Sequence, residues 1–555
     1  MTPPFAQLLA WLHQHNYNFH ANPYNFIFLT LTSFFIFMVL YNRRGGGGGG
    51  CGGDNETDRA KLPSPPGRLP VLGHLHRLGP LPHRSLWALA QDHGPIMLLH
   101  MGRVPTVVIS SAHWAQQVTK AHDASFSGRP SSRMAHELMY GARDVAFAPY
   151  GEYWRQVRRT CVLHLLSLRR VRSLRPVREE ESALMVREIA RLAELGAEFN
   201  VSELVVRLTN DIVCRAAFGR KYGGGADAEG GAGAVREALA EFVRLLGTVQ
   251  IGEFVAGVGW IERWWRGLDR RVGTTARALD GFLERVLEDH RREGRWGDEM
   301  DGRDCNDGWG GGDDDDRKMD GRDLVDVLLA VEKEDKELGV PLGQDSVKAI
   351  ILDMFAAGTD TTYTTIEWAM TELINHPEKM KKLQDEVRSV VGTDRMVLEE
   401  DLNNMAYLKA VIKETLRLHP PFPLLVPRES IEDTNLMGYH IPAKTRVIIN
   451  AWAIGRDPES WERPEEFSPE RFLDSLIDYR GQDFQFIPFG AGRRGCPGIN
   501  FAMPTAELAL ANLVHRFDWE LPGRIKEEKM DCSELNGITV HLKSRLVLVA
   551  KLWCS

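Results

Sequence analysis

The stretch FGAGRRGCPG, residues 489–498, decides the fold and the chemistry of this 555-residue chain. Its single cysteine, Cys496, lies in a glycine-rich turn directly before an apolar stretch with a helical pattern. An aromatic residue, Phe489, and a basic residue, Arg494, precede the cysteine within the same turn. A lone thiolate on a tight loop is suited to bind one metal ion. A haem iron is the best interpretation, because a thiolate ligand favours oxygen chemistry there; a zinc site or a reactive thiol are lesser alternatives.

The composition is that of a globular enzyme, with 43% hydrophobic and 26% charged residues. The net charge of −8 argues against a nucleic-acid-binding protein, which needs clustered positive charge. The seven cysteines are far apart and form no CxxC pair, so neither a disulfide framework nor a zinc site is expected. Only Cys496 lies in a loop whose sequence is adapted to present it.

An uncharged segment near the N-terminus, FIFLTLTSFFIFMVLY at residues 26–41, predicts a transmembrane helix. At helical rise it spans about 24 Å, and Tyr24 and Tyr41 can extend it into the interfaces. Arg43 and Arg44 follow it and no basic residue precedes it, which places the rest of the chain in the cytosol. A cleaved signal peptide and a buried core helix are the alternatives, but the segment lacks the basic start of a signal peptide.

The chain divides into three parts: an anchor at residues 1–44, a Gly/Pro-rich linker and hinge at 45–70, and one catalytic domain at 71–555. Biased composition predicts loops at 223–233 and 297–322. Amphipathic or apolar helical patterns cover residues 182–195, 235–246, 274–292, 324–334, 347–375 and 377–391. Strand-like pieces are short and few, at residues 96–100, 106–109, 446–449 and 545–552. The expected fold class is therefore mainly α with a minor β-sheet.

The longest helical pattern contains the sequence AGTDTT at residues 357–362. Gly358 costs about 1 kcal/mol inside a helix, and threonine hydroxyls can bond to helix carbonyls. Together they predict a notch in which a small molecule and water reach the backbone, with Asp360 and Thr361 relaying protons. A packing glycine beside two ordinary helical threonines is the simpler alternative.

Two further motifs place charged groups at helical spacing. Glu414 and Arg417 share a helix face, and Arg471 of the PERF sequence can join them in a buried network. Trp154 and Arg158 also share a face, where an indole and a guanidinium suit a carboxylate. Exposed charged faces are common, so each motif alone has a purely structural alternative.

The order of these motifs along the chain resembles that of the cytochrome P450 superfamily. The stretches DVAFAPYGEYW at residues 144–154, AGTDTT, and FIPFGAGRR at residues 486–494 resemble the plant A-type microsomal group. The resemblance implies a cytochrome P450 fold, with haem between the long central helix and the helix that follows the cysteine loop.

The resemblance also implies roles for individual residues. Cys496 would be the axial ligand of the iron of haem b. Phe489 would pack beside the sulfur, while Gly492 and Gly498 would let backbone N–H groups approach it. The propionates would be held by Trp154, Arg158, Arg428 and Arg494. Protons would come from Asp360 and Thr361, and the structural triad would be Glu414, Arg417 and Arg471.

The implied activity is a monooxygenase of the endoplasmic reticulum membrane that uses O2 and a small lipophilic plant metabolite. Electrons would come from NADPH through a flavoprotein reductase, with Arg155 and Arg159 as its candidate contacts. The pocket would be lined from residues 134–145, 352–361, 422–426 and 538–540. The alternatives are a haem-thiolate dehydratase or isomerase, such as an aldoxime dehydratase, and a non-catalytic haem-binding protein. Pro504 departs from the family pattern, because it lies inside the helix expected after Cys496.

Overall fold

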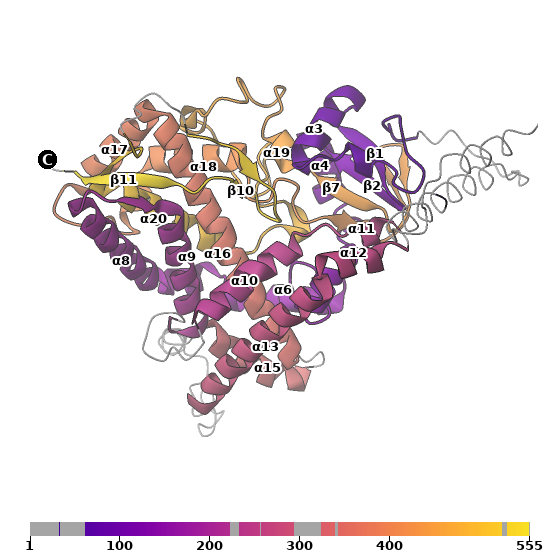
Figure 1. Cartoon of the computed structure of the whole chain (residues 1–555), viewed down its shortest axis with the longest axis horizontal. Coiled ribbons are helices and arrows are strands. Elements are labelled where there is room, and N and C mark those ends of the chain that lie inside the picture. The colour runs from indigo at the N-terminus through magenta and orange to yellow at the C-terminus, as the bar shows by residue number, and fades with distance from the viewer. Residues whose placement is uncertain are drawn as a thin grey trace, which may run out of the picture.

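The computed structural model describes residues 61–221, 232–255, 257–293, 323–338, 342–523 and 530–553, together with Ser33. Helices form most of the molecule, and small sheets lie at two of its sides (Figure 1). The first helices are α3 (Pro82–His93), α4 (Ala112–Gln116), α5 (Arg133–Leu138), α6 (Glu152–Thr160), α7 (Leu168–Ser173), α8 (Arg175–Glu194), α9 (Val201–Phe218), α10 (Ala232–Leu246), α11 (Ile251–Phe254), α12 (Gly259–Arg266) and α13 (Leu268–Glu293). They are followed by α15 (Leu324–Leu338), α16 (Gln344–Asn375), α17 (Pro377–Val391), α18 (Ala406–Leu418), α19 (Ala451–Ile454) and α20 (Ile499–Arg516).

The largest sheet has the strand order β1-β2-β7-β4. Its strands are β1 (Ile96–Met101), β2 (Val104–Ile109), β4 (Arg428–Glu429) and β7 (Arg446–Ile449). The β1–β2 pair is an antiparallel hairpin, whereas β7 joins β2 in parallel from a distant part of the chain. A second sheet pairs β3 (Glu198–Asn200) and β8 (Phe517–Glu520) with β11 (Val547–Leu552). Two hairpins remain, β5–β6 (Thr434–Leu436 and Tyr439–Ile441) and β9–β10 (Glu534–Leu535 and His541–Leu542).

The central helix α16 positions the site. It packs against α9, α20 and α18, and its apolar residues belong to the main hydrophobic core. Proline disfavours the helical conformation of the residue before it, so His376 is non-helical and α16 ends at Asn375. Pro377 then occupies the first turn of α17, where its missing N–H costs nothing. The predicted mainly helical class and the six predicted helices agree with this structure.

The structure corrects the predicted notch in the central helix. α16 remains one continuous α-helix through Gly358, Asp360 and Thr361. The Thr361 hydroxyl donates to the Ala357 carbonyl at 2.7 Å, in addition to the normal helix bonding. The threonine therefore adds a side-chain hydrogen bond to the helix and does not interrupt the backbone hydrogen bonds.

The predicted transmembrane helix at residues 26–41 lies outside the described residues, apart from Ser33. In the portion of the chain that the structure describes, we find no helix with the length and apolar character needed to cross a bilayer. Most of the linker at 45–70 and of the loop at 223–233, and all of the loop at 297–322, also lie outside the described residues.

Pro504 lies inside α20, which nevertheless continues from Ile499 to Arg516. Without an N–H, Pro504 leaves the Asn500 carbonyl without its normal helix partner. We expect Pro504→Ala to stabilise the folded protein by about 1–2 kcal/mol, after allowance for the greater chain entropy of the unfolded alanine variant. Urea unfolding of the two proteins measures this difference. A Pro504→Ala variant that is less stable than the parent would contradict the expectation.

Candidate active site

The loop before α20 presents one sulfur atom to an internal cavity. The Cys496 N–H donates to the Phe489 carbonyl at 2.9 Å, which closes the loop. The Cys496 side chain is not packed by its neighbours but faces the cavity, and its Sγ accepts a hydrogen bond from the Gly498 N–H at 3.3 Å. Burial raises the pKa of the thiol, while this hydrogen bond and the charge of Arg158 act in the opposite direction. The positive end of α20 also favours a thiolate at this place.

The cavity separates the cysteine loop from the central helix. Gly358 and Thr361 line it from α16, and Phe489 and Cys496 line it from the loop. Most of the remaining lining is apolar and comes from α9, β7 and the segment before β4: Val213, Ala216, Phe422, Leu425, Val426, Val447 and Ile449. An apolar cavity of this kind suits a largely hydrophobic cofactor and a lipophilic ligand.

Four arginines line this cavity in the described part of the chain, namely Arg129, Arg158, Arg428 and Arg494. Burial is the largest influence on each and lowers the pKa of all four side chains, that of Arg494 to about 9. Such a group of desolvated cations calls for an anionic ligand. The two propionates of a haem would meet that requirement, and the thiol of Cys496 would meet the requirement of its iron.

The arginines are held in place mainly by backbone carbonyls. Arg494 donates to Ser127 at 2.9 Å and to Ala148 at 2.7 Å, and its guanidinium lies 4.1 Å from the centre of the Trp154 ring. Arg158 donates to the Gly495 carbonyl at 2.7 Å and so ties α6 to the cysteine loop. Backbone acceptors leave the positive charges uncompensated, which preserves their attraction for an anion.

Arg428 is the member of this group with a carboxylate partner. It binds Asp123 at 2.8 Å and the Ala491 carbonyl at 2.6 Å. Asp123 also accepts the Arg493 N–H at 2.8 Å, so one carboxylate fixes both the arginine and the loop.

Sequence reasoning missed Arg129. Its Nε donates to the Ala146 carbonyl at 2.8 Å, and its Nη1 donates to the carbonyls of Val426 and Pro427 at 2.8 and 2.9 Å. It joins three segments that are distant in sequence, and a lone arginine before Pro130 is too weak a signal to reveal this.

Two predicted site residues differ from their expected placement. Gly492 is not among the residues that line the cavity; a Cβ there would lie 2.2 Å from the Thr119 carbonyl, so the glycine serves close packing on the opposite side. Its φ of +69° is a second reason for glycine.

Trp154 does line the cavity, but its indole N–H donates to the Val145 carbonyl at 3.0 Å. The indole N–H is therefore not free for a ligand, and Trp154 contributes to the site through its ring face, which packs against the Arg494 guanidinium. Gly498 lines the cavity beside the sulfur.

Asp360 and Thr361 point in different directions. Thr361 lines the cavity, whereas Asp360 accepts a hydrogen bond from the Thr539 hydroxyl and lies 3.6 Å from His541 Nε2. Burial raises the pKa of Asp360, against the opposing effects of His541 and Thr539. Residues 538–540, predicted to line the pocket, are absent from its lining among the described residues, and Thr539 instead serves Asp360.

The family model described as Cytochrome P450 matches residues 63–549. The chain belongs to the cytochrome P450 family. Relatives include Cytochrome P450 736A117 of Prunus mume, 52% identical over 89% of this chain and 91% of the relative. Cytochrome P450 71A1 of Persea americana is 50% identical, over 86% and 91%.

A further relative and a solved structure are also similar to this chain. Norfluorocurarine oxidase of a Strychnos species is 47% identical over 89% of this chain and 93% of its own. A solved zebra fish cytochrome P450 with abiraterone has a TM-score of 0.68 and 26% identity, over 86% of this chain and 100% of that chain. The chain is therefore a P450 monooxygenase of a family that serves plant specialised metabolism, with the haem cofactor that membership implies.

In this P450 the three residues of the proposed triad meet in the core. Glu414 is fully buried and binds Arg417 at 2.7 Å and Arg471 at 2.9 Å. Arg417 also donates to the carbonyls of Gly455, Pro464 and Glu466, between 2.6 and 3.0 Å. The network ties α18 to the long segment that precedes the cysteine loop.

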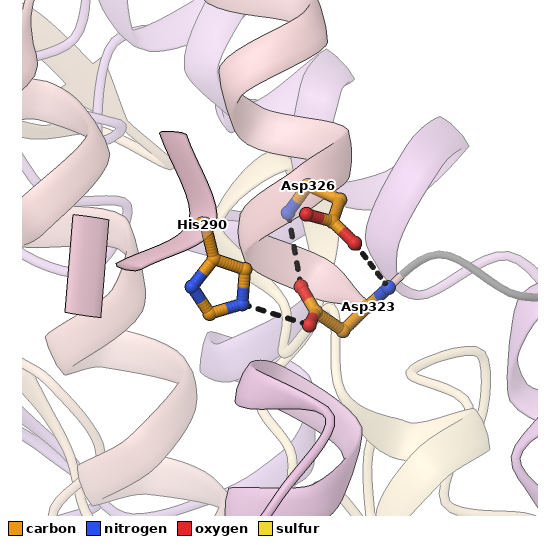
Figure 2. Close-up of side chains that lie close together, drawn as sticks. All are labelled: His290, Asp323 and Asp326. Carbon is orange, nitrogen blue, oxygen red and sulfur yellow. Dashed lines mark hydrogen bonds and ion pairs between the residues drawn. The ribbon is translucent and has the colours of Figure 1, made fainter. Parts of the chain in front are cut away.

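A second cluster of this P450, outside the cavity, contains His290, Asp323 and Asp326 (Figure 2). His290 Nε2 donates to Asp323 at 2.8 Å, and Nδ1 donates to the Val286 carbonyl at 2.7 Å. Both ring nitrogens face acceptor oxygens of the protein, so in this arrangement neither is free to bind a metal ion. Asp323 and Asp326 accept each other's backbone N–H groups, at 2.9 and 3.3 Å, as a cap of α15. The cluster therefore joins α13 to the start of α15 through the His290–Asp323 pair, and we call this pair the clasp.

This clasp predicts a pH-dependent stability. Burial lowers the pKa of His290, but its hydrogen bonds to the Asp323 carboxylate and the Val286 carbonyl outweigh this effect, so the net pKa is raised. The contribution is thus fully present below the unfolded pKa of about 6.5 and is lost as the pH rises through the folded pKa. Asp323→Asn keeps the helix cap but removes the charge. We expect its melting temperature to lie below that of the parent at about pH 6, with the gap closing in more basic buffer. A gap that does not change with pH would contradict the clasp.

Proposed function

We propose that this P450 inserts one atom of O2 into a small lipophilic plant metabolite, using electrons from NADPH delivered by a separate flavoprotein reductase. The observation that carries the proposal is the Cys496 thiol facing an apolar cavity that Thr361 lines from the opposite helix. The haem supplies the activation of O2 when it is bound. Every other requirement falls on the residues of this chain.

The first requirement is to hold the cofactor and to tune the electron density at its iron. Cys496 supplies the thiolate, and the Gly498 N–H hydrogen bond to its sulfur tunes the electron density there. Arg129, Arg158, Arg428 and Arg494, which line the cavity, would hold the propionates of a bound haem, and Phe489 would pack against it.

The second requirement is to deliver protons to the cavity. Thr361 holds its hydroxyl at the cavity wall through the bond to Ala357, so its oxygen can accept one proton and pass on another. Asp360 lies beside it in sequence, with a raised pKa that suits proton exchange nearer neutral pH. Thr539 and His541 position the Asp360 carboxyl.

We expect Thr361→Ala to lower product formation by about 100-fold, since a positioned proton donor contributes about that factor or more. NADPH consumption should persist and be diverted to hydrogen peroxide. The matched control is Thr365→Ala, which removes the same kind of bond, to the Thr361 carbonyl at 2.9 Å, from a residue that does not line the cavity. Thr361→Ser should keep most of the activity. Equal product yield per NADPH in Thr361→Ala and Thr365→Ala would refute the role of Thr361.

The substrate class follows from the cavity lining. Phe422, Leu425 and Val426 are apolar, and together with Val213 they favour a lipophilic molecule. The Strychnos relative is named as an oxidase of norfluorocurarine, which is consistent with a plant specialised metabolite. Residues 26–41 would anchor the protein in the endoplasmic reticulum membrane, with the catalytic domain in the cytosol. Arg155 and Arg159 of α6 are exposed and would contact the reductase.

The proposal is tested by turnover of a metabolite identified in a binding screen, under heavy-isotope O2 with NADPH and reductase. One labelled oxygen atom per product is the expected result. Product that contains no label, formed without NADPH, would instead indicate a dehydratase or isomerase and would overturn the proposal.

A further inference from the structure

Two aspartate side chains meet inside the protein, beside the active-site cavity. Asp144 belongs to the segment before α6 and is 0% exposed, whereas Asp353 belongs to α16 and is 9% exposed. Their carboxyl groups are in hydrogen-bond contact with each other, and Asp353 also lines the cavity. We call Asp144 and Asp353 the acid pair. The mechanism described above gives this pair no role.

Backbone N–H groups hold both carboxyl groups of the acid pair. The Val145 N–H donates to Asp353 Oδ2 at 2.6 Å, and the Phe147 N–H donates to Asp144 Oδ2 at 2.9 Å. Asp144 Oδ1 differs from these atoms, because it is buried and has no donor among the described residues. Ionised carboxylates only accept hydrogen bonds, so two of them in contact would repel each other and leave this oxygen unsatisfied. A proton held between the two groups supplies the missing donor.

The surroundings of the acid pair favour one negative charge and not two. Burial raises the pKa of Asp353, and the facing carboxyl group of Asp144 raises it further. Burial also raises the pKa of Asp144, while backbone N–H groups and the charge of Arg129 act in the opposite direction. Two carboxyl groups in contact titrate as one unit, in which the second proton leaves at a much higher pH than the first.

The other titratable side chains that influence the pair, or are influenced by it, leave this balance unchanged. Arg494 is a second nearby cation, whose pKa burial lowers and Asp144 raises. Tyr153 lies in α6 and Cys161 directly follows α6, and burial raises the pKa of both. Since both side chains are therefore neutral at neutral pH, they add no negative charge next to the pair.

The acid pair attaches to α16 the segment that carries the acceptors of two cavity arginines. The Ala146 carbonyl accepts from Arg129 at 2.8 Å, and the Ala148 carbonyl accepts from Arg494 at 2.7 Å. Both carbonyls lie within four residues of Asp144. The attachment of this segment to the central helix therefore sets where the two guanidinium groups lie.

We propose that Asp144 and Asp353 share one proton, and that this contact positions Arg129 and Arg494 for the propionates of haem. The two aspartates are positioning residues, because they act through the arginines and not on the cofactor. Loss of the shared proton to base leaves two facing negative charges, which repel the segment at 144–148 from α16. Because the pKa is raised, the contact is present below that pKa and is lost as the pH rises through it.

Infrared difference spectra of the full-length holoprotein test the shared proton without turnover. In Asp353→Asn the new amide can donate to Asp144, and in Asp144→Asn it can donate to Asp353, so each variant replaces the proton while the contact remains. We expect each variant to remove the same C=O band of a protonated carboxyl group, identified by its shift in D2O and by 13C-labelled aspartate. A parent protein without this band would overturn the proposal. So would a band that persists in Asp144→Asn, because the proton would then belong to Asp353 alone.

The rate of haem transfer to excess apomyoglobin tests the positioning role. Asp353→Ala removes the contact and should speed haem loss by about 10-fold, the lower end of what residues that orient ligand-holding groups contribute. Asp353→Asn should restore slow loss. It should also keep the loss slow in basic buffer, where the parent loses haem faster. Haem loss that rises with pH equally in the parent and in Asp353→Asn would contradict the role of the shared proton.

The matched control is Asp345→Ala, in the first turn of the same helix. Its side chain is 56% exposed and lies 3.8 Å from Arg143, so it makes a surface ion pair to the residue before Asp144. Such a pair contributes little, and haem loss should stay at the parental rate. If Asp353→Ala lost haem no faster than Asp345→Ala, the acid pair would not position the arginines and the proposal would fall.

Discussion

Cys496→Ser is expected to lower monooxygenase turnover by more than about 100-fold, because even residues that only orient a metal ligand contribute about 10- to 100-fold. The stability of the protein fold should change little. The Cys496 sulfur faces the cavity and accepts a hydrogen bond from the Gly498 N–H, which a serine hydroxyl can also accept. Turnover with NADPH and reductase, haem content and melting temperature are measured together.

A control separates loss of the ligand from loss of a thiol in general. Cys161 is a buried thiol that does not line the cavity, and Cys161→Ser should retain the spectrum and most of the activity. If Cys496→Ser retained full turnover, the assignment of the iron ligand would be wrong. If Cys161→Ser lost the iron ligand's spectral signature, the assignment would also fail.

Glu414→Ala is expected to cost about 3–5 kcal/mol of unfolding free energy, since it leaves a buried arginine without its counter-ion. Glu414 and Arg417 both have fully buried side chains, and Glu414 accepts from Arg417, Arg471 and the Ser468 N–H. Loss of this carboxylate releases α18 from the segment before the cysteine loop. Urea unfolding gives the free energy, and haem retention reports on the loop.

The matched control is Glu462→Ala, close in sequence to the triad. Its side chain is 88% exposed and lies 3.8 Å from Arg463, so the change should be within about 0.5 kcal/mol. A Glu414→Ala protein as stable as Glu462→Ala would contradict the role of the triad in the fold.

Local patterns in the sequence were sufficient for the helices and for the cysteine loop. The apolar pattern of α16 predicts most of its length, and Pro377 after its end predicts where it stops, because these effects act between near neighbours. The loop before Cys496 is recognisable because its glycines, arginines and cysteine all lie within ten residues of sequence.

Contacts between distant segments could not be predicted. Asp360 is bound by Thr539, 179 residues away, and this pairing leaves no trace in the local sequence around either residue. Arg129 joins the cavity through the carbonyls of Val426 and Pro427, almost 300 residues later. Backbone carbonyls carry no side-chain signal, so such arginine sites become visible only once the fold is known.

The reduced, carbon monoxide-bound spectrum of the full-length holoprotein tests the central claim most directly. The account predicts the red-shifted band of a haem with a thiolate ligand, and its loss in Cys496→Ser protein that still binds haem. A well-folded, haem-loaded parent protein without this band would contradict the assignment of Cys496 as the ligand, and with it the proposed monooxygenase mechanism.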